Sequence, residues 1–196
     1  MKKGTVWTIT IVAIVAILVI WVVKGYNGLV TAEETVTTEW ANVESQYQRR
    51  ADLIPNLVST VKGYAAHEQE TLDAVVSARA KATQMSVDAK DLTPEKLKEF
   101  QAAQGEVGSA LGRLLMITEN YPDLKANQNF MALQEQLEGT ENRIQVARQK
   151  FNATAQTYNT MIRRFPKNLL AGIFGFDKKT YFEADEAAQK APSVQF

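Results

Sequence analysis

Apolar side chains fill residues 4–23, a run of 20 residues without a charge. A helix of that length spans about 30 Å, which is the thickness of the hydrocarbon core of a bilayer. The run is longer than the apolar core of a typical secretory signal peptide, and Lys24 ends it between aromatic residues. We therefore predict a transmembrane anchor over residues 1–25. The alternative is a signal peptide cleaved at the small residues of 30–32.

Basic residues near the ends of the span set its expected orientation. Lys2 and Lys3 precede the span together with the terminal amine, whereas Lys24 is the only basic residue after it until Arg49. Lysine and arginine tend to be retained on the cytoplasmic side of a membrane. We expect a single-pass membrane protein with its N-terminus in the cytoplasm and the following domain outside it.

Beyond residue 29 the apolar spacing is helical nearly everywhere, and no stretch shows the alternation of a strand. A repeat of seven residues predicts one helix over about residues 29–82, with its main positions at Trp40, Tyr47, Ile54 and Val61. Pro55 lies within this helix and has no amide hydrogen. We therefore expect a kink at Pro55, or a restart of the helix capped by Asp52.

A second helix is predicted to begin after Thr93, because Pro94 then occupies its first position, and to end before Pro122. Three glycines interrupt its interior, although glycine disfavours a helix by about 1 kcal/mol relative to alanine. We expect another backbone to pack closely against these positions, which are Gly105, Gly108 and Gly112.

The last helix has the most regular pattern in the chain. Large apolar residues recur at intervals of seven, at Phe130, Leu137, Ile144, Phe151, Tyr158 and Phe165. This predicts a helix of about 36 residues, roughly 54 Å long, that packs in a bundle or coiled coil and ends before Pro166. The predicted fold class is all-α, with an N-terminal transmembrane helix followed by an antiparallel long-helix bundle. The bundle domain covers residues 26–186, and residues 187–196 form a flexible C-terminal tail.

Residues 168–176 form an apolar patch that is too short to cross a bilayer. This patch either folds back onto the bundle, dips into a membrane interface or meets another subunit, and the pattern leaves all three open. Its candidate oligomer or membrane contacts are Leu169, Leu170, Ile173, Phe174 and Phe176.

The composition removes most enzyme chemistry. The chain has 22 basic and 22 acidic residues, no cysteine and a single histidine, His67. Zero net charge gives no electrostatic footprint for nucleic acid, and metal or catalytic sites built on cysteine or histidine are incomplete. His67 and Glu68 match the first two positions of a zinc-protease motif, but Thr71 occupies the position of the second histidine that the motif requires. We expect no enzyme activity, no cofactor, no metal and no nucleic-acid partner.

Charged residues at seam positions are the candidate interaction sites. Arg50 and Glu68 fall in registers that otherwise hold apolar residues, and buried charges need partners on a neighbouring helix. One interpretation is an interhelical polar network that fixes helix register. The other is a recognition surface for a protein partner or an anionic ligand. The residues concerned are Arg49, Arg50, Asp52, Glu68, Glu138, Glu141, Asn142 and Arg143.

Several longer motifs resemble the LemA family. They are Tyr26-Asn27, QRRADLIPNLVSTVKGYAAHE (48–68), ENYPDLKAN (119–127), NFMALQEQLEGTENRIQVAR (129–148), FGF (174–176) and YFEADE (181–186). Together these motifs cover nearly the whole chain outside the apolar segment. The resemblance implies a bacterial single-pass membrane protein whose soluble part is a long-helix bundle, with no established activity and no catalytic or binding residues to transfer. It also suggests association with envelope proteins such as a membrane protease.

Two functions follow as hypotheses. The first is a non-enzymatic, membrane-anchored scaffold or adaptor of the bacterial cell envelope that associates with itself. Long helices expose much lateral surface, and confinement to a membrane raises the local concentration of neighbouring copies. The second is an envelope ligand-binding or sensing module with a polar cleft near Arg49, Arg50 and Glu141.

Overall fold

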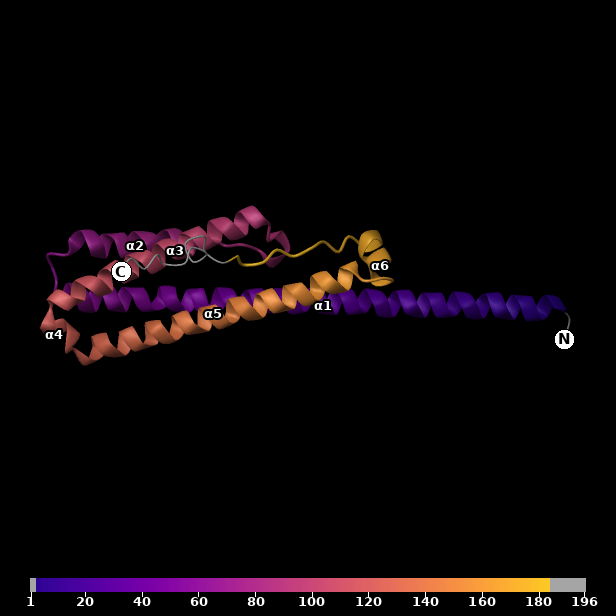
Figure 1. The fold of residues 1–196 in the computed structure, drawn as a ribbon, viewed down its shortest axis with the longest axis horizontal. Coiled ribbons are helices and arrows are strands. Elements are labelled where there is room, and N and C mark those ends of the chain that lie inside the picture. Colours follow the sequence, from indigo (N-terminus) through magenta and orange to yellow (C-terminus); the bar gives the residue numbers. More distant parts are fainter. Residues whose placement is uncertain (1–2, 184–196) are drawn as a thin grey trace, which may run out of the picture.

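A computed structural model describes residues 3–183 of the chain (Figure 1). Every regular element in that part is helical, which confirms the all-α prediction. The elements are α1 (Lys3–Lys62), α2 (Gln69–Gln84), α3 (Pro94–Ile117), α4 (Pro122–Lys125), α5 (Gln128–Arg163) and α6 (Lys167–Phe174), with short 3-10 helices η1 (Ala89–Asp91) and η2 (Thr118–Asn120). The tail predicted over residues 187–196 lies outside the described residues.

The four long helices run alternately in opposite directions, so the bundle is antiparallel as predicted (Figure 1). The most extensive helix contacts join α1 to α5 and α2 to α3. Two clusters of buried apolar side chains fill the interior. One contains Trp40 and Phe151 in the half of the bundle nearer α6, and the other contains Leu57 and Leu114 in the far half.

The helix α1 has 60 residues, which corresponds to a length of about 90 Å. Its N-terminal part projects beyond the bundle (Figure 1), and none of its most apolar window is buried. The first buried residue in the described part of the chain is Gly25. The bundle therefore leaves the apolar run of α1 uncovered, and the same helix continues without interruption into the core.

The predicted restart at Pro55, capped by Asp52, is wrong, and so is the single helix over residues 29–82. The helix α1 continues through Pro55 and ends at Lys62, and the chain then turns at Gly63 before α2 begins. Glycine is the poorest helix former after proline, so the chain can reverse there at little cost. Pro55 has no amide hydrogen to donate to the carbonyl of Ala51, and that carbonyl accepts a hydrogen bond from Arg79 on α2 instead.

The start of α3 agrees with the sequence. The Oγ1 atom of Thr93 accepts a hydrogen bond from the amide of Lys96, and Pro94 occupies the first turn. The close approach predicted at the three helix glycines is wrong. A Cβ atom added at any of them would meet nothing within 4 Å, because all three lie on the exposed side of α3, away from the buried face that carries Phe100 and Leu111; they are Gly105, Gly108 and Gly112.

The helix α5 has the predicted length of 36 residues, and the side chain of Asn127 caps its first turn by accepting from the amide of Phe130. The seven-residue repeat marks its buried face correctly from Phe130 to Tyr158. The last member of the repeat, Phe165, departs from the pattern and is 80% exposed. It follows the end of α5 at Arg163, so helical periodicity no longer governs where its side chain points.

After α6 the chain returns along α5 as an extended strap. Two asparagine side chains of α5 hold it through paired hydrogen bonds with the backbone. The side chain of Asn159 donates to the backbone carbonyl of Lys179 and accepts from its backbone amide. The side chain of Asn152 forms the same pair of hydrogen bonds with Phe182, and all four distances are 2.8–2.9 Å. The strap places the ring of Phe182 against Trp40, with 5.8 Å between ring centroids.

Candidate functional site

Arg50 joins three helices in the middle of the bundle. Its Nη1 atom donates to Oε1 of Glu141 on α5 at 2.9 Å. Its Nη2 atom donates to the backbone carbonyl of Gln104 on α3 at 2.9 Å and to the Oε1 atom of the same residue at 2.6 Å. Only 4% of Arg50 is exposed, so the guanidinium needs these acceptors to offset the loss of hydration. The residue meets the interhelical partners that its seam position requires.

A second arginine, Arg79, also forms a hydrogen bond between two helices in this region. The Nε atom of Arg79 on α2 donates to the backbone carbonyl of Ala51 on α1 at 2.7 Å. Both ends of this hydrogen bond are shielded from water, since Ala51 is buried and Arg79 is half-buried. Arg79 therefore attaches α2 to α1 in the way that Arg50 attaches α1 to α3 and α5.

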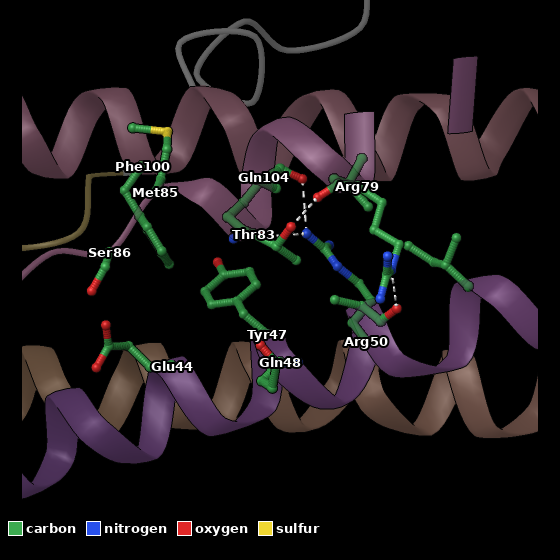
Figure 2. A pocket seen from close by; sticks show the side chains of 14 residues that line it. Glu44, Tyr47, Gln48, Arg50, Arg79, Thr83, Met85, Ser86, Phe100 and Gln104 are labelled. Atoms are coloured by element: carbon green, nitrogen blue, oxygen red, sulfur yellow. Dashed lines mark hydrogen bonds between the residues drawn. The ribbon is translucent and has the colours of Figure 1, made fainter. Parts of the chain in front are cut away.

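These side chains border a pocket of about 210 Å³ between α1, α2 and α3 (Figure 2). Polar groups line much of it, namely Glu44, Gln48, Arg50, Arg79, Ser86 and Gln104. Figure 2 shows Arg50 and Gln104 joined by hydrogen bonds across the space between α1 and α3. Arg49 and Glu141, which the sequence placed beside a cleft with Arg50, are not among the lining residues.

Two ionisable groups that line the pocket have raised pKa values, the carboxyl group of Glu44 and the hydroxyl group of Tyr47, and burial is the largest cause for both. Partial burial raises the pKa of the Glu44 carboxyl group above the ordinary value, and the negative charge of Asp88 raises it further. A hydrogen bond with the Trp40 side chain acts in the opposite direction and is smaller than the effect of burial. The indole of Trp40 also donates to the carbonyl of Val87 at 2.9 Å, which fixes the segment after α2 beside Glu44.

The chemistry available at the pocket is hydrogen bonding and charge pairing. The guanidinium groups of Arg50 and Arg79 are already engaged with protein acceptors. Within residues 3–183, no three or more His, Cys, Asp or Glu side chains lie close enough together to hold a metal ion. The arrangement therefore has the properties of an internal polar network with a small open space beside it.

The other polar residues that the sequence singled out lie apart from this network. Arg49 is exposed, and Asp52 accepts a hydrogen bond from Gln48 one turn away on the surface of α1. Glu68 lies between α1 and α2 and accepts from the hydroxyl of Tyr121 at 2.9 Å. Glu138 is exposed on α5. The structure thus joins only Arg50 and Glu141 out of the two predicted charge clusters.

Asn142 and Arg143 border a groove of about 440 Å³ between α1 and α5. Glu39, Gln46, Val146 and Lys150 also line this groove. The Oε1 atom of Gln46 is buried there and has no hydrogen-bond partner among the described residues. A buried acceptor without a donor lowers the stability of the fold.

The sequence pattern did not identify three residues of the network and its pocket. Gln104, Arg79 and Glu44 sit on helix faces that look like ordinary polar surface in a one-dimensional pattern. One signal was present for Arg79, because Pro55 leaves a helix carbonyl in need of a donor. Only the packing of α2 on α1 identifies which side chain supplies that donor.

The apolar patch of residues 168–176 folds onto α1 as the short helix α6. Leu170 is buried there, and a Cβ atom added at Gly25 would overlap its Cδ1 atom. Leu170 is therefore not available for the oligomer or membrane contact predicted for it. Phe176 is half-buried, while the remaining candidate contacts, Leu169, Ile173 and Phe174, are exposed.

The apolar segment lies outside the bundle and continues into it as one helix, and the buried charge of Arg50 is used for hydrogen bonds within the bundle. These features define a membrane-associated helical-bundle protein. The chain belongs to the LemA family, whose family model matches residues 39–196. This result confirms the resemblance that the sequence motifs indicated.

Curated relatives extend the comparison. The magnetosome proteins MamQ 1 and MamQ 2 of Paramagnetospirillum magneticum are each 30% identical to the chain over 204 residues, which cover 94% of this chain and 75% of theirs. MamQ of Magnetospirillum gryphiswaldense is 31% identical over 200 residues, covering 91% of this chain and 72% of its own. Protein LemA of Metamycoplasma hominis is 24% identical over 160 residues, covering 82% and 69%.

Proposed function

We propose that the protein is a non-enzymatic scaffold or adaptor of the bacterial cell envelope, anchored by a single membrane span and able to associate with itself. The observation that carries the proposal is the continuity of α1 from the apolar segment through the bundle. A continuous helix transmits orientation, whereas a flexible linker does not. The bundle therefore has a fixed direction relative to its membrane anchor.

The use of the buried charges supports a structural role over a catalytic one. Catalytic acids, bases and nucleophiles need groups whose reactive atoms face a substrate. The most deeply buried charge, on Arg50, instead bonds to acceptors of α3 and α5. We also propose, from the sequence alone, that the bundle domain extends over residues 26–186 and lies outside the cytoplasm.

The groove between α1 and α5 is the surface we assign to self-association. It carries an acidic side chain, Glu39, and two basic ones, Arg143 and Lys150. In a two-fold contact the same patch meets itself, so opposite charges within one groove can pair between copies.

Disulfide crosslinking in proteoliposomes tests this assignment. The chain has no cysteine, so Val146→Cys creates a single thiol at the edge of the groove. We expect dimers to form on mild oxidation and to persist when the protein is diluted with lipid. The matched control is Met116→Cys on α3, whose side chain is 68% exposed. Equal crosslinking of the two variants, or loss of the Val146→Cys dimer on dilution, would contradict self-association through the groove.

An adaptor also has a second protein to contact, and we propose an envelope protein such as a membrane protease. A photoreactive residue at Val146 in growing bacteria would then capture that protein, whereas one at Met116 would not. Recovery of the same proteins from both positions would count against a specific docking surface on the groove.

A second candidate function is ligand sensing in the pocket beside Arg50. The observation that favours it is the open space of about 210 Å³ next to Glu44, whose pKa is raised. Thermal unfolding with and without a panel of small polar metabolites tests it. A ligand that raises the melting temperature of the natural chain but not of Ser86→Trp, which puts a bulky side chain at an exposed position of the pocket lining, would support sensing.

A further inference from the structure

Four large apolar side chains lie uncovered at the end of the bundle from which α1 projects. Phe165 is 80% exposed, Ile173 75%, Leu169 53% and Phe174 47%. All four belong to the last turn before α6 or to α6 itself, whose other side is buried through Leu170 and Ala171. Single exposed apolar residues are common, but four within ten residues form a patch that indicates a contact.

The position of this patch is fixed by α1. Tyr26 packs edge-to-face against Phe174, with 4.9 Å between ring centroids, and against Phe176, with 5.7 Å. Leu170 occupies the space above Gly25. The uncharged run of α1 ends at Val23, only about 5 Å along the helix axis from Tyr26. The exposed face of α6 therefore lies at the level where the apolar segment ends (Figure 1).

The charges closest to the patch are mainly basic, and the first acidic residues on either side are Glu33 and Asp177. Lys24, Arg163 and Arg164 are exposed, and Lys167 is half-buried beside Gly28. The sequence has no Asp or Glu within residues 1–32 or 163–176. Apolar side chains combined with arginine, lysine and aromatic rings are the composition that favours the interface of a membrane with anionic lipids.

We propose that α6 and the end of α5 form a membrane foot, in which Phe165, Leu169, Ile173 and Phe174 enter the headgroup region of the bilayer that α1 spans. The neighbouring basic side chains contact anionic lipid phosphates. A lipid surface fits this patch better than a second copy of the chain, because a two-fold contact would bring like charges together. The span also holds the patch at the bilayer surface, where lipid is always available.

The foot gives the bundle a second attachment to the membrane. A single span leaves a rod free to tilt, whereas two separate contacts restrict its angle to the bilayer. This inference rests on the membrane anchor of the proposed function and not on its self-association, and it holds on whichever side of the membrane the bundle lies. The anchor itself is checked separately, by flotation of the full chain with vesicles.

Fluorescence quenching in proteoliposomes tests the foot. Ile173→Cys in the full chain gives one thiol, which is labelled with the environment-sensitive dye NBD. The vesicles contain phosphatidylethanolamine and phosphatidylglycerol, with a nitroxide quencher on a fraction of the acyl chains near the headgroup. We expect at least a twofold loss of emission at position 173. The control, Met116→Cys with the same dye, lies on the part of α3 remote from α6 and should show none.

A substitution tests the contribution of charge. The triple variant Arg163→Gln, Arg164→Gln and Lys167→Gln should reduce the quenching at position 173 in anionic vesicles and bring it close to the value in phosphatidylcholine vesicles. The matched control, Arg143→Gln with Lys150→Gln, removes basic residues from the middle of α5 and should leave the quenching unchanged. Circular dichroism verifies that each variant keeps its helical content.

Three results would overturn the proposal. The first is a label at position 173 that is quenched no more than the label at position 116, with a label at Leu169→Cys giving the same result. The second is quenching at position 173 that is weak at high protein density and rises when the protein is diluted with lipid, because this would show that a second copy covers the patch. The third is quenching at position 173 that is insensitive to both the triple variant and the lipid charge, because this would exclude the anionic-lipid contact.

Discussion

Arg79 on α2 donates its Nε hydrogen to the carbonyl oxygen of Ala51 on α1, with 2.7 Å between the two heavy atoms. In an uninterrupted helix that carbonyl would accept from the amide of residue 55, four positions later. Residue 55 is Pro55, which has no amide hydrogen. Arg79 therefore supplies from another helix the donor that α1 lacks, and this explains how α1 continues through a proline without ending.

The first prediction is a coupling between Arg79 and Pro55. Arg79→Ala should lower the free energy of unfolding by about 1–3 kcal/mol, because it leaves a buried carbonyl without a donor. In a Pro55→Ala background the amide returns, and the same substitution should cost clearly less. Urea unfolding of the full chain in detergent, followed by circular dichroism, measures all four proteins of this cycle.

The control for this cycle is Lys81→Ala, also on α2, which removes an exposed ion pair with Glu106. Surface pairs contribute about 0–1 kcal/mol, so this change should be small and independent of residue 55. Additive effects of Arg79→Ala and Pro55→Ala would refute the compensation.

A second prediction concerns the asymmetry of the Arg50 network. Arg50→Ala should destabilise the fold by about 1–3 kcal/mol, since it leaves the acceptors of Gln104 in the interior without a donor. Glu141→Ala should cost much less, because 49% of that side chain is exposed and Arg50 keeps both bonds to Gln104. Melting temperatures of the two variants test this order, and a larger effect of Glu141→Ala would contradict it.

The raised pKa of Glu44 leads to a third prediction, on pH dependence. A folded-state pKa above the unfolded value means that the folded state favours the protonated carboxyl. This contribution to stability is fully present below the unfolded pKa and is lost as the pH rises through the folded pKa.

Glu44→Gln should therefore raise the melting temperature at pH 7 relative to the natural chain, with the difference shrinking as the pH falls through the ordinary range of a glutamate. The comparison is Glu138→Gln, an exposed site on α5. If Glu44→Gln were destabilising at pH 7, the burial of a charged carboxyl would not be the dominant effect at this site.

Glycines give a fourth prediction. Gly108→Ala should stabilise the protein by about 0.5–1 kcal/mol, because the position is helical and an added Cβ atom meets nothing within 4 Å. Gly25→Ala should not give this gain, because the new Cβ atom would overlap the Cδ1 atom of Leu170 and force that side chain to repack between α1 and α6. Limited proteolysis around α6 distinguishes the two variants, and equal resistance of both would show that Gly25 is not required for the contact.

The sequence by itself determined the features that repeat locally. The uncharged run of residues 4–23, the seven-residue repeat from Phe130 to Tyr158 and the cap at Thr93 each follow from interactions within one helix or between a helix and its solvent. These interactions depend on neighbours a few positions away, so a one-dimensional pattern contains them.

Tertiary structure decided which distant residues meet. The glycines of α3 illustrate the limit, because a pattern cannot tell whether a small residue faces another backbone or open solvent. Pro55 interrupts α1 by its own chemistry, yet α1 continues because Arg79, 24 positions later in the sequence, reaches Ala51. Arg50 finds Gln104 and Glu141 only when α3 and α5 are packed beside α1, since hydrogen bonds act over about 3 Å while these residues lie 54 and 91 positions away in the sequence.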